Sequence, residues 1–178
     1  MLLGLLPPIG LEIPSSCYAV NIPLKLDVLG VVTLDFKGGI RERVEANLGG
    51  GLGGVKLKVI GFEVSADSPV LGKVTMAQAD VDTTPLSLLE LTSNLPPAFR
   101  QTKFLDYTLT IEKPPGGGPP LVLSNTKTVK LMNDKLHAFP PQGNVYQLQE
   151  PVDFAPVGAP NKVVAQLLAF PSTWSHNP

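Results

Sequence analysis

The stretch VTLDFKGGIRERVE, residues 32–45, decides the fold class of this chain. Apolar side chains occupy every second position from Val32 to Phe36, and polar side chains fill the positions between them. This alternation is expected of a β-strand that buries one face and exposes the other. The same period resumes at Ile40, after the pair Gly38-Gly39, so we predict a hairpin that turns at the two glycines.

Similar alternating runs recur along the rest of the chain. In residues 55–59, VKLKV, the apolar positions are odd-numbered, whereas around Gly61 the apolar residues Ile60, Phe62 and Val64 are even-numbered. A β-bulge near Gly61 would produce this change of face. Residues 105–111, LDYTLTI, form the clearest strand pattern of all. Counting these runs gives about nine or ten short strands.

Residues 85–93 differ from the rest of the sequence. Four leucines follow Pro85, and Pro96-Pro97 lies shortly after them, which favours at most one short helix near 85–93. No strand pattern is followed by a helical pattern of 10 to 15 residues, so the sequence does not predict parallel βαβ units. We therefore predict an all-β fold, a two-sheet antiparallel sandwich or jelly roll.

The beginning of the chain is apolar and interrupted by prolines, and its first charged residue is Glu12. We expect residues 1–17 to form an apolar N-terminal arm or edge segment, and residues 18–178 to form a single β-sandwich domain. The arm either lies across its own domain or docks on a neighbouring subunit. The sequence leaves both alternatives open.

Charge is sparse and balanced in this protein. Charged residues make up 16% of the chain, against about 25% in typical soluble domains, and the formal net charge is -1. This balance provides no field that would attract phosphate backbones, so we expect no nucleic-acid partner. No apolar run approaches the roughly 20 residues of a membrane-spanning helix, and we expect no integral membrane span. Low surface charge also favours self-association.

Motifs for metals and nucleotides are weak. The glycine-rich stretch at residues 49–54 leads into a strand pattern, whereas phosphate-binding loops open a helix, so we interpret it as a hairpin tip. His137 and His176 do not have the spacing of zinc ligands. Asp80 and Asp82 share one side of an extended segment, yet calcium requires six or more oxygen ligands, and two carboxylates alone do not supply them.

Catalytic motifs are equally weak. The single cysteine, Cys17, excludes an intramolecular disulfide and precedes a strand, so it lacks the helix N-terminus that lowers a thiol pKa. No serine lies in a GxSxG motif. We expect no catalytic residue, no cofactor and no metal ion, and hence no enzyme.

Three functions are compatible with these features. The first is a structural or interaction module that assembles with copies of itself through the N-terminal arm or strand edges. The second is a module that binds an apolar small molecule or lipid between the sheets or at one end of the fold. The third is a hydrolase or isomerase that uses His137 together with a distant carboxylate.

Overall fold

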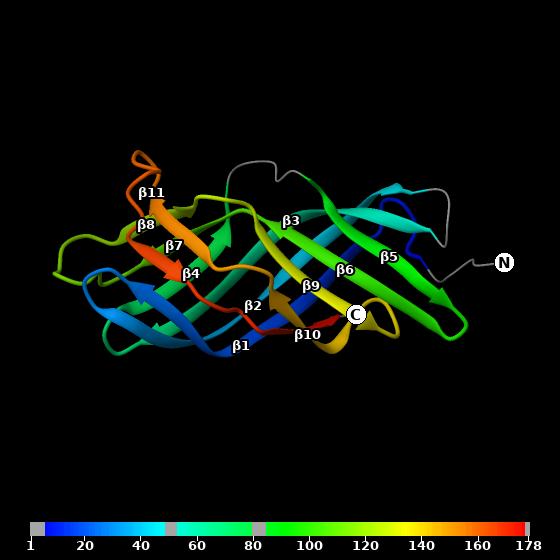
Figure 1. The fold of residues 1–178 in the computed structure, drawn as a ribbon, viewed down its shortest axis with the longest axis horizontal. Coiled ribbons are helices and arrows are strands. Elements are labelled where there is room, and N and C mark those ends of the chain that lie inside the picture. Colours follow the sequence, from blue (N-terminus) through cyan, green and yellow to red (C-terminus); the bar gives the residue numbers. More distant parts are fainter. Residues whose placement is uncertain (1–5, 49–52, 80–84, 177–178) are drawn as a thin grey trace.

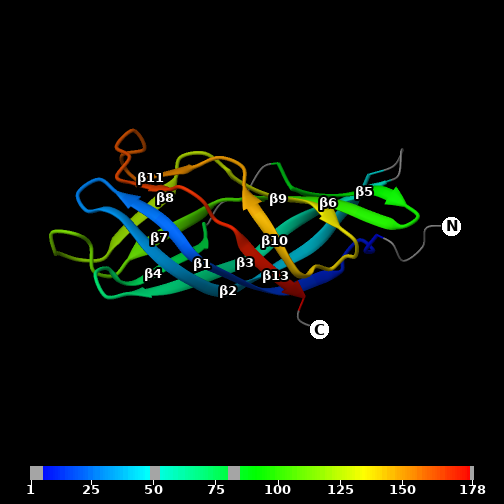
Figure 2. The same ribbon diagram turned by 60° about the horizontal axis from the view of Figure 1, so that its bottom comes forward.

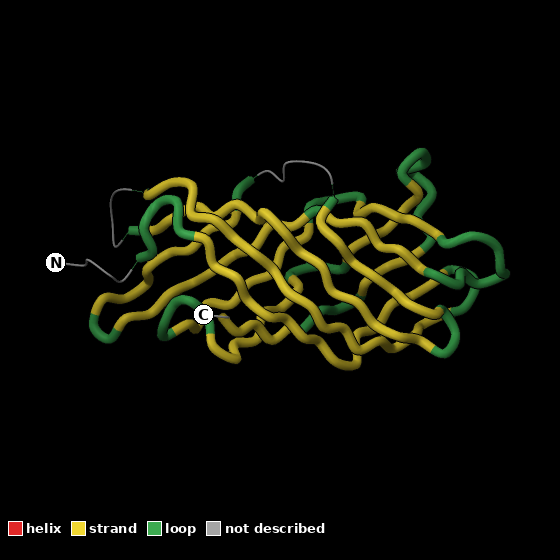
Figure 3. Tube along the Cα trace, turned by 180° about the vertical axis from the view of Figure 1, so that it is seen from behind, coloured by secondary structure: helices red, strands yellow, loops and turns green. Residues whose placement is uncertain are grey.

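The computed structural model describes residues 6–48, 53–79 and 85–176, and all regular structure in these residues is β. The described residues contain no helix, and therefore none that is long and apolar enough to cross a membrane. These residues form thirteen antiparallel strands in one sheet. Strands make up most of the trace in Figure 3. The strands are β1 (Glu12–Leu26), β2 (Gly30–Asn47), β3 (Gly54–Ser68), β4 (Gly72–Gln78), β5 (Ser87–Asn94), β6 (Pro97–Leu105), β7 (Tyr107–Ile111), β8 (Leu121–Asn125), β9 (Val129–Leu136), β10 (Gln142–Leu148), β11 (Val152–Pro156), β12 (Ala165–Leu167) and β13 (Ser172–His176).

The sheet closes on itself twice. Pairing of β12 with β1 closes a first ring, made of β1, β2, β3, β4, β7, β8, β11 and β12. Pairing of β3 with β5 closes a second ring, made of β1, β2, β3, β5, β6, β9, β10 and β13. The two rings lie end to end and share the three long strands, which run the length of the molecule (Figures 1 and 2).

In two of the three shared strands, β1 and β3, the set of buried positions changes at the junction between the rings. In β1 the register shifts between Ala19 and Ile22, and in β3 it shifts between Val59 and Gly61. Apart from Gly54 at the start of β3, buried positions are odd-numbered before each shift and even-numbered after it. The bulge predicted near Gly61 is therefore confirmed. A bulge bends its strand and changes the direction in which the following side chains point. One strand can therefore bury side chains in the interiors of both rings.

The hairpin predicted at Gly38-Gly39 is wrong, because β2 continues through both glycines. Gly38 pairs with Cys17 of β1 on one side and with Val64 of β3 on the other. A Cβ atom on Gly38 would overlap the backbone carbonyl oxygen of Glu63. The glycines therefore permit close packing of three strands and do not form a turn.

The helix predicted near 85–93 is also wrong. Residues 87–94 form β5, in which Ser87, Leu89 and Leu91 are buried and Leu88 and Glu90 are only partly buried. This two-residue period places one face of β5 on the core. Pairing with β3 and β6 satisfies the backbone of β5 on both sides, and this tertiary pairing overrides the local helical signal.

The all-β prediction is confirmed at the level of class. The structure differs from the predicted sandwich or jelly roll, since the described residues form one continuous sheet of thirteen strands, against the nine or ten predicted. A strand in a sandwich and a strand in a closed sheet both bury one face, so both produce the same alternation in sequence. Strand alternation alone does not distinguish these architectures.

Aromatic side chains connect the interiors of the two rings. The Phe62 ring lies 6.3 Å from Trp174 of the second ring and 5.6 Å from Tyr107 of the first. Tyr107 in turn lies 5.8 Å from Phe154. These centroid distances are those of favourable aromatic pairs, so the junction between the rings is a packed core.

Residues 6–11 lie against the second ring of the same chain. The Gly10 N–H donates to the Val44 carbonyl at 2.8 Å, and the Val44 N–H donates to the Leu11 carbonyl at 2.9 Å. Leu6 packs against the core, and β1 begins at Glu12. Residues 1–5, which begin the predicted arm, lie outside the described residues, and the division at residue 17 stays a prediction.

Candidate ligand-binding site

An apolar pocket of about 380 Å³ lies at the open end of the first ring. Four separate segments meet there: the turn after β1, the loop between β7 and β8 with the start of β8, the end of β11, and the residues before β12. Its lining is mostly apolar, with two charged side chains: Leu26, Val28, Pro114, Pro115, Leu121, Pro156 and Val164, together with Asp27 and Lys162.

Backbone hydrogen bonds hold the rim of this pocket in place. The Asp27 N–H donates to the Val164 carbonyl at 3.2 Å, and the Leu29 N–H donates to the Leu26 carbonyl at 3.3 Å. On the opposite wall the Gly117 N–H donates to the Pro114 carbonyl at 3.0 Å. These bonds fix the loops whose side chains form the walls.

The prolines suit this position because a proline has no N–H group that a ligand or water must satisfy. Pro114 and Pro115 begin the PPGGGPP loop and are half-buried, whereas residues 116–120 are exposed. The loop thus combines an apolar wall with a solvated tip. A wall of this kind favours apolar ligand surface over polar groups.

A polar recess of about 190 Å³ adjoins the apolar pocket. Asp27 lines both, and the remaining polar lining of the recess is Lys25, Asp153 and Gln166. These three residues lie side by side on β1, β11 and β12, because Lys25 is opposite Gln166 and Gln166 is opposite Asp153. The Gln166 amide donates to the Asp153 carboxylate at 2.8 Å.

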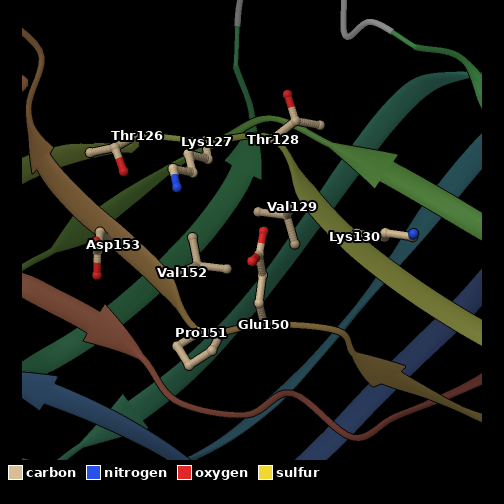
Figure 4. Close-up of a pocket in the computed structure, with 9 residues that line it drawn as sticks. All are labelled: Thr126, Lys127, Thr128, Val129, Lys130, Glu150, Pro151, Val152 and Asp153. Carbon is tan, nitrogen blue, oxygen red and sulfur yellow. The ribbon is translucent and has the colours of Figure 1, made fainter.

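A smaller cleft lies where the chain passes between the rings, at the β8–β9 and β10–β11 connections. The side chains of Lys127 and Glu150 approach it from opposite sides, while Lys130 points away (Figure 4). Its volume is about 60 Å³. A water molecule needs only about 10–15 Å³ of such space, so this cleft has room for a few waters and is too small for a drug-sized ligand.

A buried polar network lies inside the second ring. The Lys103 ammonium on β6 donates to the Glu42 carboxylate on β2 at 2.6 Å, and the two side chains are 1% and 2% exposed. The same ammonium lies 4.6 Å from the centre of the Trp174 ring and 5.1 Å from that of Tyr146. One carboxylate and two aromatic faces therefore surround the cation.

Gln101 and Tyr146 complete the network. The Gln101 amide donates to both Glu42 oxygens at 3.5 and 3.4 Å, and the Tyr146 hydroxyl donates to the Gln101 carbonyl oxygen. Burial raises the pKa of Tyr146, and the Glu42 charge raises it further. Of the described residues, only Asn94 has a buried side-chain oxygen without a hydrogen-bond partner, and it lies at the end of β5. The network satisfies itself and has an architectural role.

The histidines singled out from the sequence are not part of these sites. His137 is exposed just after β9, and His176 ends β13, where its backbone N–H donates to the Pro141 carbonyl at 2.9 Å. Within the described residues no group of three or more His, Cys, Asp or Glu side chains is arranged to hold a metal ion. Asp80, Asp82 and residues 49–52 of the glycine-rich stretch lie outside the described part of the chain.

Cys17 is buried in β1, and burial raises its thiol pKa to about 12, while the Lys103 charge acts in the opposite direction. We expect a thiol reagent at pH 8 to leave native Cys17 unmodified and to modify it after unfolding in guanidinium chloride. The control is Tyr18→Cys in a Cys17→Ala background, because residue 18 lies on the exposed face and its thiol should react in the native protein. Rapid native modification of Cys17 would contradict the burial.

The same pKa shift predicts a dependence of stability on pH. The folded-state pKa of Cys17 lies above the value of about 8.5 for an exposed thiol, so the protonated form is favoured by folding. This contribution is complete below about pH 8.5 and is lost as pH rises toward the folded-state value.

Comparison with known proteins gives a structural likeness. No protein-family model matches the sequence, and no curated protein matches it. Among solved structures, DynF from the dynemicin biosynthesis pathway of Micromonospora chersina matches with a TM-score of 0.72 and 19% sequence identity. The match covers 96% of this chain and 82% of DynF.

This likeness corrects the leading functional hypothesis, a structural module that assembles with itself. That hypothesis used strand edges or the N-terminal arm as docking surfaces, whereas every described strand here is paired on both sides. Residues 6–11 also pack on their own chain. The self-assembling module is therefore wrong, and the comparison shows a fold that this chain shares with DynF, a protein of a biosynthesis pathway.

Proposed function

We propose that this protein binds an apolar small molecule in the pocket at the mouth of the first ring. The observation that carries the proposal is the pocket itself, whose volume of about 380 Å³ lies within the roughly 300–1,000 Å³ of small-molecule sites. Such sites are mostly apolar and carry a few polar groups that orient the ligand. Seven apolar residues with Asp27 and Lys162 match that composition.

Exposed apolar side chains around the pocket support this function. Val28 lines the pocket and is 80% exposed, and Val157, which follows the lining residue Pro156, is 70% exposed. A bound apolar molecule would remove part of this surface from water, which contributes about 25 cal/mol for each Å² buried. The likeness to DynF also supports the proposed function, because DynF belongs to a biosynthesis pathway and the proteins of such pathways encounter small molecules.

The proposal contains no catalytic step. The charged residues of the pocket, Asp27 and Lys162, are both exposed to solvent. The buried ion pair, Lys103 with Glu42, lies in the second ring and not at the pocket. We therefore propose a binding protein and not an enzyme.

Titration with the neutral apolar dye Nile red tests the proposal. Leu121→Asp should weaken dye binding at least about tenfold, or about 1.4 kcal/mol, because it places a carboxylate in an apolar pocket. The matched control is Val122→Asp, since Val122 follows directly on β8 and is 47% exposed. Equal dye affinity of Leu121→Asp and the unaltered protein would show that the dye binds elsewhere and would contradict the assigned site.

A further inference from the structure

We infer that the ligand is a neutral amphiphile whose polar end carries hydroxyl groups. This inference rests on the proposed function and names the ligand class. The apolar body lies in the mouth pocket, and the hydroxyl-bearing end crosses Asp27 into the polar recess formed by Lys25, Asp153 and Gln166.

The two cavities are adjacent at the rim of the ring. Asp27 lines both, and the other rim residues alternate between them along the chain. Leu26 and Val164 line the apolar pocket, whereas their neighbours Lys25 and Val163 line the recess. Successive residues of an extended segment point to opposite faces. The two cavities therefore lie on opposite faces of the same segments, separated only by their backbone. A ligand of modest length therefore reaches both over Asp27.

Hydrogen-bonding groups in the recess determine what it can hold. Within the described part of the chain, the side chains of Lys25 and Asp27 make no hydrogen bond or ion pair, while Gln166 uses one N–H on Asp153. This leaves carboxylate oxygens of Asp27 and Asp153 and the amide oxygen of Gln166 as acceptors, and the Lys25 ammonium as the strongest donor. A hydroxyl group both donates and accepts, so it matches this mixture of partners.

The charges favour a neutral ligand over an ionic one. Asp27 and Asp153 carry two negative charges, and Lys25 and Lys162 carry two positive charges, so the pocket and recess are balanced together. A carboxylate in the recess would face both aspartates, and an ammonium group there would face Lys25, with Lys162 in the adjoining pocket on the other side of Asp27. Each ion therefore meets a repulsive partner beside an attractive one, whereas hydroxyl groups meet neither penalty.

Three detergents with the same eight-carbon chain test the inference. Octyl glucoside, nonanoate and octyltrimethylammonium, which each have eight apolar carbons, are used below the concentration at which they form micelles to displace Nile red. We expect octyl glucoside to displace the dye at a concentration at least about tenfold lower than either ion, as a difference of about 1.4 kcal/mol requires. Displacement by nonanoate or the ammonium compound at an equal or lower concentration would overturn the inference, as would failure of octyl glucoside to displace the dye.

Variants separate this inference from the proposed function. Asp153→Ala should weaken octyl glucoside binding several-fold and leave Nile red affinity unchanged, because Asp153 lines the recess and not the apolar pocket. Asp67→Ala, an exposed aspartate on β3, is the control and should change neither. Unchanged octyl glucoside affinity in Asp153→Ala refutes the inference alone. Dye binding that is insensitive to Leu121→Asp refutes the proposed function.

Discussion

Replacement of Lys103 by methionine is expected to lower the free energy of unfolding by about 3–5 kcal/mol. Methionine preserves most of the side-chain volume but removes the cation that lies 2.6 Å from the Glu42 carboxylate. Glu42 would then be a buried charge with only the long hydrogen bonds from Gln101. Guanidinium chloride unfolding followed by far-ultraviolet circular dichroism measures the loss without relying on the fluorescence of Trp174, which lies beside the substituted position.

A second change distinguishes loss of the ion pair from loss of packing. Glu42→Gln combined with Lys103→Met removes both charges and retains an amide oxygen that accepts from Gln101. We expect this double variant to recover most of the lost stability, because replacing a buried ion pair by neutral groups is often neutral or favourable. Lys130→Met on the neighbouring strand β9 is the exposed control and should change stability by less than about 0.5 kcal/mol.

Either of two results would contradict the assignment of Lys103. One is a loss below about 1 kcal/mol in the single variant, which is the range of an exposed ion pair. The other is a double variant no more stable than the single one, since the stability would then depend on the shape of the lysine side chain and not on its charge.

Sequence alternation predicts most of the strands because it reports a local property, which is one buried face. The bulge at Gly61 is visible in the sequence for the same reason, since the apolar positions change from odd to even there. Closure of the sheet is different. It depends on the pairing of β1 with β12 and of β3 with β5, strands that lie far apart in the chain, and nothing in either strand specifies its distant neighbour.

The buried network leaves a partial signal in the sequence. Along β6 the interior positions run Phe99, Gln101, Lys103 and Leu105, so two polar residues occupy an otherwise apolar face. This pattern indicates buried polar groups that need partners. The partner Glu42 is 61 positions away, however, and in the sequence it resembles the exposed charges around it.

The pocket leaves no such signal. Its lining comes from four connecting segments, and each of them alone resembles an ordinary exposed loop. Closure of the first ring brings these segments together, so the site becomes visible only when the non-local pairing is known. Composition alone therefore predicts only that a ligand would be apolar, and the residues of the proposed site follow from the strand pairing.

Gly38→Ala is expected to cost about 3 kcal/mol, at the upper end of the usual range for overpacking. The added Cβ would overlap the Glu63 carbonyl oxygen and would lie 2.7 Å from the Val64 Cα atom. Both obstacles are backbone atoms, so no side-chain rotation relieves the clash. Pairing of β2 with β1 and β3 on either side prevents the strand from moving away without breaking ladder hydrogen bonds.

Gly61→Ala is the matched control, because a Cβ on Gly61 meets no atom within 4 Å. Its effect should lie between no change and a gain of about 1 kcal/mol, since alanine restricts the unfolded chain more than glycine does. Thermal and guanidinium chloride unfolding of the two variants measures the difference directly. Equal stabilities of Gly38→Ala and Gly61→Ala would mean that β2 moves at the junction of the rings without a loss of stability. Close packing of the three shared strands would then not be what holds the two rings in register.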